Sequence, residues 1–154
     1  MRDALRILLL RLRSRGRLRA ARDVKVGERV RVEVSPGARV VLAPGASLGA
    51  GSRIEAVAGT VRVGPGARLG ERAVVVSHAG VEIGPNAVIG DWAAVEGAAP
   101  SYEDVETPVR EQPLRAGPVT IGAGAVLGPH AVVGPGVVVP AGREVAPYAV
   151  VNSV

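Results

Sequence analysis

The chain of 154 residues contains no cysteine and no phenylalanine, and it has only one tryptophan and two tyrosines. Without cysteine it can form no disulfide, no thiolate metal site and no cysteine nucleophile. This fits a cytoplasmic protein, which is the location that we expect. Because large aromatic residues are scarce, valine, isoleucine, leucine and alanine must fill the core. The hydrophobic content of 47% is sufficient for such a core.

Long apolar runs are also missing. The apolar run near the N-terminus, residues 7–10, is bracketed by Arg6 and Arg11. A transmembrane helix needs roughly 20 apolar residues, and the apolar part of a signal peptide is longer than four. We therefore expect neither secretion nor a transmembrane anchor.

The net charge of +5 comes from one segment. Residues 1–23 contain eight arginines and only two aspartates, whereas residues 24–154 are close to neutral. We therefore divide the chain into a basic N-terminal segment, residues 1–23, and a second domain, residues 24–154.

A six-residue repeat runs through the second domain. Position i of this repeat is a large aliphatic residue, which falls at Leu42, Leu48, Ile54, Val63, Leu69, Val75, Ile83, Ile89, Val95, Ile121, Leu127, Val133, Val139, Val145 and Val151. Insertions of 3, 2 and 20 residues interrupt the repeat without changing its register. Position i+4 is alanine or serine in 12 of 14 cases, and position i+1 is often glycine.

A period of six is neither the 3.6 of a helix nor the alternation of a strand. It predicts short strands joined by tight corners, in which three repeats form one triangular coil of 18 residues. We predict an all-β fold, a parallel β-helix of about five coils whose first coil starts near Val24 to Val32. The small i+4 residue should face inward, and nearby glycines should supply the corner conformations. The longest insertion predicts an external loop over residues 98–118.

The pattern Ile-Gly-x-x-Ala-Val at residues 83–88 and 121–126 resembles the hexapeptide-repeat acyltransferases. Residues 102–114 resemble the external loop of sugar and polysaccharide O-acetyltransferases, and residues 145–151 resemble their closing coil. The resemblance implies a left-handed coil and a homotrimer with acyl-CoA in the cleft between subunits. It also implies a loop histidine that acts as general base on the acceptor hydroxyl.

This resemblance predicts an acetyl-CoA-dependent O-acyltransferase that modifies a hydroxyl of a sugar or cell-envelope precursor. The loop exit, Gly97-Ala98-Ala99-Pro100-Ser101, has no histidine, however. The alternative is a catalytically degenerate β-helix scaffold or regulatory binding protein.

His78 is our candidate for the catalytic base. It occupies position i+3 after Val75, one coil before the equivalent Ala98. It should therefore lie on the same corner as the missing base, about 4.8 Å away. A structural corner residue is the competing interpretation. His130 is the other histidine, and two histidines without cysteine do not make the three-ligand zinc site of a γ-class carbonic anhydrase. We therefore predict no metal.

For the acyl donor, backbone amides near Gly128 and Gly134 suit a pantetheine arm. The resemblance places Arg143 where a basic residue meets CoA phosphates, and a bulged corner with a solvated arginine is the alternative.

For the acceptor, we select Asp91, Trp92, Tyr102 and Asp104. The acids could orient a base or bind a sugar, or they could be solvated surface. Trp92 could stack on a sugar or an adenine ring, or it could anchor a subunit interface. Its i+3 position is shared with His130.

Residues 2–14 predict a helix with Leu5, Leu8, Leu9 and Leu12 on one face. It could cap the open end of the β-helix or lie on an anionic membrane surface, with contact through residues 1–20. Nucleic acid is the third possibility. We do not predict it, because no aromatic residue interleaves the arginines.

Overall fold

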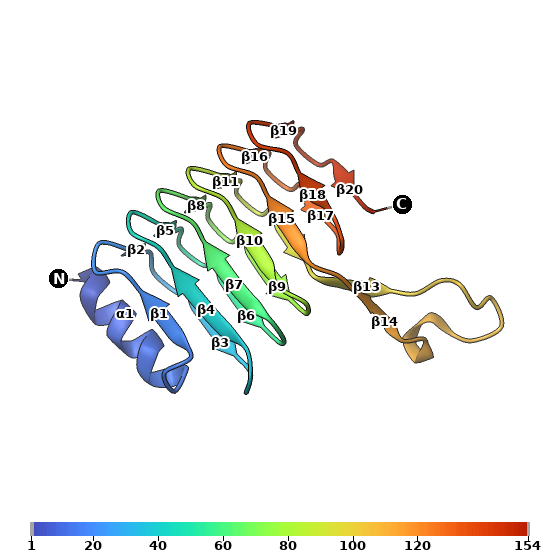
Figure 1. The fold of residues 1–154 in the computed structure, drawn as a ribbon, viewed down its shortest axis with the longest axis horizontal. Coiled ribbons are helices and arrows are strands. Elements are labelled where there is room, and N and C mark those ends of the chain that lie inside the picture. The colour runs from blue at the N-terminus through green and yellow to red at the C-terminus, as the bar shows by residue number, and fades with distance from the viewer. Residues whose placement is uncertain (1, 154) are drawn as a thin grey trace.

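The computed structural model describes residues 2–153, so Met1 and Val154, the outer limits of the two expected segments, lie outside it. The chain winds into a tube of stacked coils, with helix α1 (Arg2–Arg13) at one end and an arm projecting from the side (Figure 1). The predicted fold class, an all-β parallel β-helix with one N-terminal helix and one external loop, is confirmed. The tube has six coils, because each of its sheets contains six strands.

Three parallel sheets form the sides of the tube, and each coil contributes one strand to each sheet. The first sheet contains β1 (Leu18–Ala20), β4 (Arg39–Leu42), β7 (Thr60–Val63), β10 (Val81–Ile83), β15 (Val119–Ile121) and β18 (Val138–Val139). The second contains β2 (Lys25–Val26), β5 (Ser47–Leu48), β8 (Arg68–Leu69), β11 (Val88–Ile89), β16 (Val126–Leu127) and β19 (Glu144–Val145). The third contains β3 (Arg31–Val34), β6 (Arg53–Ala56), β9 (Val74–Ser77), β12 (Ala94–Glu96), β17 (Val132–Val133) and β20 (Val150–Val151).

We call the turn from the first to the second sheet the first corner, and the turn from the second to the third sheet the second corner. The third corner leads from the third sheet to the first sheet of the next coil. Between coils four and five the third corner carries the arm. The arm contains the antiparallel pair β13 (Ala98–Pro100) and β14 (Leu114–Ala116) and a short 3₁₀ turn, η1 (Val109–Glu111).

The repeat defines the core as predicted. The aliphatic residue at position i is at most 3% exposed in every repeat from Leu42 to Val139. The inward i+4 prediction holds for Ala87 and Ala93, which are fully buried. It is wrong for Ala58 and Ala79, which are exposed. There the insertions lengthen β6 and β9, so alternation continues and places Ala56 and Ser77 inside instead.

The corners differ from the prediction in how they use glycine. The left-handed backbone conformation falls at position i+3, and at several corners a residue other than glycine adopts it: Arg72, Asn86, Trp92, His130 and Tyr148. The i+1 glycines have another role. A Cβ atom at Gly90 would lie 2.5 Å from the carbonyl oxygen of Leu127 in the next coil. Glycine at i+1 therefore permits the close stacking of successive coils.

Helix α1 caps the first coil, as one of our interpretations predicted. The face that packs is not the predicted one, however, because Ile7 and Leu10 join the core while the Leu5 face points to solvent. The first coil begins at Leu18, which pairs with Val40, so it starts inside the segment that we had assigned to the basic N-terminus.

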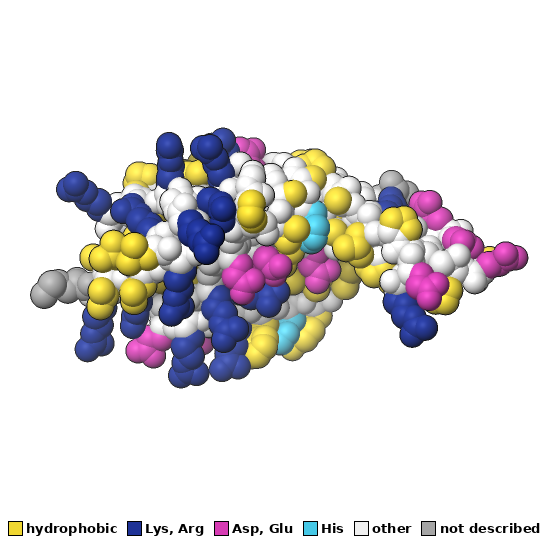
Figure 2. Space-filling view, turned by 90° about the horizontal axis from the view of Figure 1, so that it is seen from below, with side chains coloured by type: hydrophobic (Ala, Val, Ile, Leu, Met, Phe, Trp, Pro, Cys, Tyr) yellow, Lys and Arg dark blue, Asp and Glu magenta, His cyan; other side chains and the backbone are white. Residues whose placement is uncertain are grey.

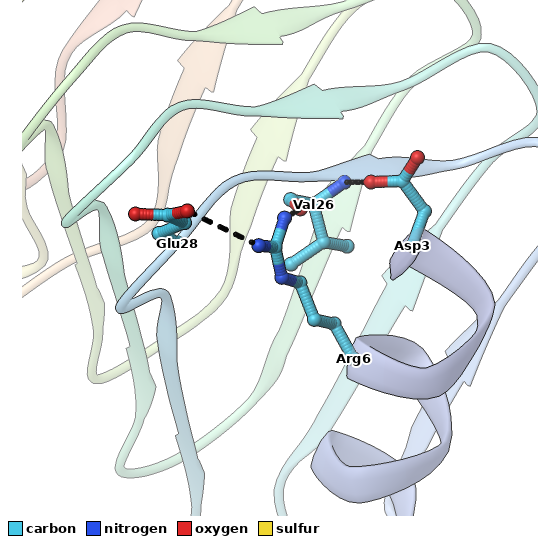
Figure 3. Close-up of polar contacts among 4 residues, drawn as sticks. All are labelled: Asp3, Arg6, Val26 and Glu28. Carbon is cyan, nitrogen blue, oxygen red and sulfur yellow. Dashed lines mark hydrogen bonds and ion pairs between the residues drawn. The ribbon is translucent and has the colours of Figure 1, made fainter. Parts of the chain in front are cut away.

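Polar contacts fix the orientation of the helix (Figure 3). The Arg6 guanidinium donates to the carbonyl oxygen of Val26 at 2.8 Å, and the Asp3 carboxylate accepts from the Val26 amide at 3.0 Å. Arg6 also forms an ion pair with Glu28 at 3.7 Å. These contacts bind the first half of the helix to the second strand of the first coil.

Candidate functional site

The arm leaves and rejoins the tube at the third corner. Ala98 pairs with Ala116 across β13 and β14, and the amide of Gly117 donates to the carbonyl oxygen of Gly97 at 3.0 Å. These contacts hold the base of the arm against the coils. The arm then extends away from the tube (Figure 1).

A cavity of about 310 Å³ lies between the base of the arm and the last two coils. We call it the arm cavity, and its lining residues are Ala99, Pro100, Tyr102, Arg115, Ala116, Gly117, Pro135, Gly136, Asn152 and Ser153. Most of this lining is small side chains and backbone. A Cβ atom at Gly117 would lie 2.8 Å from the amide nitrogen of Gly136, so the wall is tightly packed there. Tyr102, Arg115 and Asn152 supply polar groups, which gives an apolar slot with a few hydrogen-bonding groups.

His78 lies where its register predicted, one coil below the exit of the arm. β9 pairs with β12 through Val76 and Glu96, and a Cβ atom at Gly97 would lie 2.8 Å from the backbone nitrogen of His78. The histidine is half-buried and is not part of the arm cavity. The structure therefore places His78 on the correct corner but on a different coil from the cavity.

The surroundings of His78 are unusual for a general base. Its Nδ1 atom is buried, and no protein group among residues 2–153 forms a hydrogen bond with it. Catalytic histidines commonly donate the proton of one ring nitrogen to a carbonyl or carboxylate, which fixes the tautomer and leaves the other nitrogen free to accept a proton. The chain supplies no such partner to Nδ1. It therefore does not fix the tautomer that a base acting through Nε2 requires.

The second corner carries a column of stacked side chains, which we call the corner stack: Arg72, Trp92, His130 and Tyr148. The rings of Trp92 and His130 are parallel within 3° with centroids 5.9 Å apart, and His130 and Tyr148 are 4.8 Å apart. The Arg72 guanidinium lies 4.9 Å from the centre of the Trp92 ring, a cation–π distance. All four have a positive φ. This follows from their shared position i+3, where the corners of the tube adopt the left-handed conformation.

The corner stack changes the interpretation of Trp92. Its two faces are taken by Arg72 and His130, so stacking on a sugar or an adenine would require displacing one of them. What remains exposed is the edge of the column, and Trp92 is half exposed while Tyr148 is more so. This geometry favours the second interpretation, an anchor in a protein interface.

An open groove of about 530 Å³ runs beside the lower part of the corner stack. Its lining residues are Glu28, Arg29, Arg31, Ala50, Gly51, Arg53, Glu71, Arg72, Val74 and Trp92. Arg31 and Arg53 are directly opposite each other in neighbouring strands. Like charges in this position repel each other, and Glu55 compensates Arg53 at 3.0 Å. We call this surface the arginine groove.

The predicted acceptor residues are not brought together within one chain. Asp91 and Trp92 lie at the second corner, whereas Tyr102 lines the arm cavity at the third. Asp91 has a structural contact, because its carboxylate accepts from the amide of Glu71 at 2.8 Å. Asp104 lies farther out on the arm and holds a turn there. It accepts from the Thr107 hydroxyl at 2.5 Å and from the Glu106 amide at 2.9 Å.

The predicted donor residues are separated as well. Gly128 is at the second corner, Gly134 at the third and Arg143 at the first, so no single ligand-binding surface of one chain contains all three. Gly134 directly precedes Pro135 in the arm cavity. Arg143 is exposed and forms a regular corner rather than a bulge, since its amide donates to the carbonyl oxygen of Pro140 at 3.2 Å.

The sequence reasoning missed several residues of these surfaces. Arg115 and Asn152 line the arm cavity, and Arg31 and Arg53 line the arginine groove. Arg31 and Arg53 could have been found from the register, because each precedes an inward-facing residue at the same position of successive coils. Arg115 could not, because its place depends on how β14 pairs with β13.

Two further properties concern residues 2–153. No three histidine, cysteine, aspartate or glutamate side chains in this range form a group that could hold a metal ion. No helix in this range has the length and apolar character that crossing a bilayer requires.

Comparisons with known proteins agree with this architecture. No family model matches the chain. A Mycobacterium tuberculosis protein named "Probable acetyltransferase Rv3034c" is 29% identical in an alignment of 128 positions, which covers 71% of this chain. The chain spans only 43% of the length of that relative.

Two solved structures share the fold. One is a mutant of AntD, an N-acyltransferase from Bacillus cereus, in complex with dTDP-4-amino-4,6-dideoxyglucose and coenzyme A. Its TM-score is 0.64 at 16% identity, and the match covers 84% of this chain and 75% of AntD. The other is the acetyltransferase domain of PglB from Neisseria gonorrhoeae, with a TM-score of 0.57 at 18% identity over 88% of this chain and 54% of that one. The resemblance to acyltransferases of this fold is confirmed.

Proposed function

We propose that the protein is an acyl-CoA-dependent acyltransferase that transfers an acetyl group to a hydroxyl of a sugar or cell-envelope precursor. The observation that carries this proposal is the arm cavity, which is lined mostly by small residues and backbone and lies between an external arm and the coils. A pantetheine arm is thin and needs hydrogen-bonding groups with little side-chain bulk. The sequence similarity to a protein named as an acetyltransferase gives independent support.

The arm cavity suits the donor better than the residues that we predicted from the sequence. Arg115 and Asn152 provide a cation and an amide at its wall, and Tyr102 provides a hydroxyl. In this proposal Arg115 meets the negative charge of CoA, and Asn152 binds an amide of the pantetheine arm. AntD, which has this fold, is described in complex with coenzyme A and a nucleotide-linked amino sugar, which supports a sugar as acceptor.

The active form in this proposal is a homotrimer with the donor between neighbouring subunits. The exposed edge of the corner stack supports this, because aromatic residues and arginine are enriched in interface cores. A trimer would also explain why Trp92 and Tyr102 lie on different corners of one chain. Residues of two corners can contribute to one site when two subunits meet.

His78 acts as the general base in this proposal, with a small effect. A positioned base contributes roughly 10²- to 10⁴-fold to a rate. Because the chain gives Nδ1 no orienting partner, we expect His78 to act at the lower end of that range, about 100-fold. Its Nε2 atom would take the proton of the acceptor hydroxyl as the oxygen attacks the thioester carbonyl. It would then give that proton to the sulfur as the C–S bond breaks, so that CoA leaves as the thiol and the acetyl ester remains on the acceptor.

The same observation favours a second candidate function. A corner histidine without an orienting partner, in a chain whose arm exit has no histidine, is what a β-helix binding scaffold that has lost catalysis would retain. Such a protein would bind CoA or a glycan without transferring an acyl group.

The test measures donor binding and turnover separately. Calorimetry with acetyl-CoA should show binding that Arg115→Gln weakens by about tenfold, as expected when one charged contact is lost. Release of free CoA thiol should then be measured with paired sugars that differ only in a hydroxyl or an amino group. His78→Ala should lower turnover on the hydroxyl sugar by about 100-fold.

Three results would change the proposal. Binding without turnover on any acceptor would establish the scaffold. Faster turnover on the amino sugar would make the protein an N-acyltransferase. Absence of acetyl-CoA binding would refute both the transferase and the CoA-binding scaffold.

A further inference from the structure

Helix α1 has two apolar faces, and the tube uses only one of them. Ile7 and Leu10 pack into the core at 5% and 6% exposure. On the opposite side, the exposed fractions are 58% for Leu5, 51% for Leu8, 47% for Leu9 and 67% for Leu12. We call these four residues the leucine face. A contiguous group of exposed leucines marks an interaction surface, whereas single exposed apolar residues need no explanation.

Positive charge surrounds the leucine face. Arg2, Arg13, Arg15, Arg19 and Arg22 are exposed, and none of them forms an ion pair with a carboxylate among residues 2–153. Figure 2 shows hydrophobic side chains at the N-terminal end of the tube with Lys and Arg on both sides of them. The cluster is a local feature, because the domain beyond residue 23 is close to neutral.

The basic surface continues onto the tube. Arg13 and Arg31 line one depression together with Leu10 and Glu33, and Arg31 also lines the arginine groove, which includes Glu28 and Glu71. The arginines therefore extend from the end of α1 along the third sheet with glutamates among them, and the excess of positive charge is greatest in residues 1–23. Phosphate groups are the natural counter-ions for arginines placed in this way.

The orientation of the helix is fixed, so the leucine face cannot turn inward. Arg6 and Asp3 both bind Val26, and Arg11 donates to the carbonyl oxygen of Ala20. The leucine face is therefore exposed without any rearrangement of the helix. With 12 residues the helix is about 18 Å long, too short to span a hydrocarbon core of about 30 Å.

We propose that α1 is a membrane-docking element, which inserts the leucine face into the interface of an anionic lipid bilayer while the surrounding arginines bind lipid phosphates. An apolar helix face with a basic border is the pattern of interfacial helices. Charge complementarity selects the bilayer over a second copy of the chain, because two such basic ends repel each other. This proposal does not depend on acyl transfer. Its consequence for the proposed function is that the acceptor would be a sugar carried on a lipid.

The test is flotation of the full chain with vesicles of phosphatidylcholine alone and of phosphatidylcholine with 30% phosphatidylserine. We expect binding to the anionic vesicles that falls steeply with salt. Leu8→Ser/Leu12→Ser should weaken binding at least about tenfold, because it removes half of the leucine face. Arg13→Gln/Arg15→Gln should weaken it by more than about tenfold, as each arginine contributes near an anionic surface. The matched control is Leu114→Ser/Val138→Ser, two apolar residues of similar exposure far from the helix, which should bind like the parent.

Three outcomes would overturn the proposal. One is a full chain that floats with neither vesicle. Another is binding that the Leu8/Leu12 variant retains, since the contact would then lie elsewhere. The last is a lower molecular mass for the Leu8/Leu12 variant than for the parent in light scattering, when the parent binds no vesicles. A second copy of the chain would then cover the leucine face. Thermal melting should be unchanged in the variant because both side chains are exposed. If it is not, the arginine variant and the salt dependence decide the question.

Discussion

Replacing Gly90 by alanine should destabilise the tube, while the same change at Gly134 should be nearly neutral. Both glycines occupy position i+1, and neither has a positive φ, so the backbone itself permits alanine at both. They differ in what the new methyl group meets. At Gly90 it would lie 2.5 Å from the carbonyl oxygen of Leu127 and 2.9 Å from two more backbone atoms of the next coil. At Gly134 it would lie 2.6 Å from the side-chain oxygen of Asn152, which can rotate away.

The magnitudes follow from these contacts. To accept the methyl group at Gly90, coils four and five must separate by nearly 1 Å, and the hydrogen bond from its amide to Leu127, 2.8 Å long, must stretch. Overpacking costs about 1–3 kcal/mol, and a weakened hydrogen bond adds about 1 kcal/mol. Alanine also lowers the conformational entropy of the unfolded chain, which offsets about 0.4–1 kcal/mol of this loss. We expect a net loss of about 2–3 kcal/mol for Gly90→Ala and less than about 1 kcal/mol for Gly134→Ala.

Urea unfolding followed by circular dichroism measures both values. Trp92 fluorescence should report the same transition, because Trp92 lies two residues from Gly90 at the second corner and its ring contacts would be lost on unfolding. Equal stability losses in the two variants would refute the reasoning, because they would show that the backbone of the next coil is not what excludes a side chain at position i+1.

Other consequences of the structure can be measured directly. Ile7→Ala should lower the free energy of unfolding by about 2–5 kcal/mol, the usual cost of a large-to-small change in a core, which chemical denaturation will show; a loss below 1 kcal/mol would mean that α1 does not cap the tube. Tyr148→Ala should shift the chain toward monomer in light scattering if the corner stack anchors a trimer, and an unchanged mass would remove the stack from the interface. The hydrogen bonds from the Thr107 side chain and the Glu106 amide lower the pKa of Asp104 below its ordinary 3.8. The turn that Asp104 holds is thus fully stabilised above pH 3.8, and this stabilisation is lost as the pH falls through the lowered pKa, because the folded turn binds the proton more weakly. An NMR titration that gives the Asp104 carboxyl a pKa at or above 3.8 would contradict this.

The repeat predicted the core because its signal is local and redundant. Leu48, Leu69 and Ile89 had to stack once the period of six was recognised, and the structure buries all three. The same register predicted that His130 would align with Trp92, and the two rings are parallel. Periodicity was sufficient in these cases because each coil contacts only its neighbours.

The helix face could not be predicted in this way. A helix with leucines on most sides has several possible apolar faces, and the hydrophobic pattern alone favoured the one with Leu5 and Leu8. What fixes the orientation is polar: Asp3 and Arg6 both bind the backbone of Val26. That contact depends on where the first coil begins, which the irregular spacing before Leu42 concealed.

The candidate site shows a related limit. Residues such as Asp91 and Tyr102 were grouped by chemistry, although a triangular coil assigns them to different corners. The arm cavity depends on the pairing of β13 with β14, which the repeat does not encode. Grouping candidates by corner before grouping them by chemistry would have separated them correctly.

The parallel stacking of the coils also determines how the protein should respond to mechanical force. Every strand of the tube bonds only to the coils on either side, so tension on the C-terminus should peel off one coil at a time and not rupture the domain at once. The last coils repeat every 18 residues, and each should lengthen the chain by about 60 Å as it opens. The fourth coil, which carries the arm, should release a segment about twice as long. A pulling experiment should therefore show steps of similar length with one long step among them, and that step would mark the position of the arm.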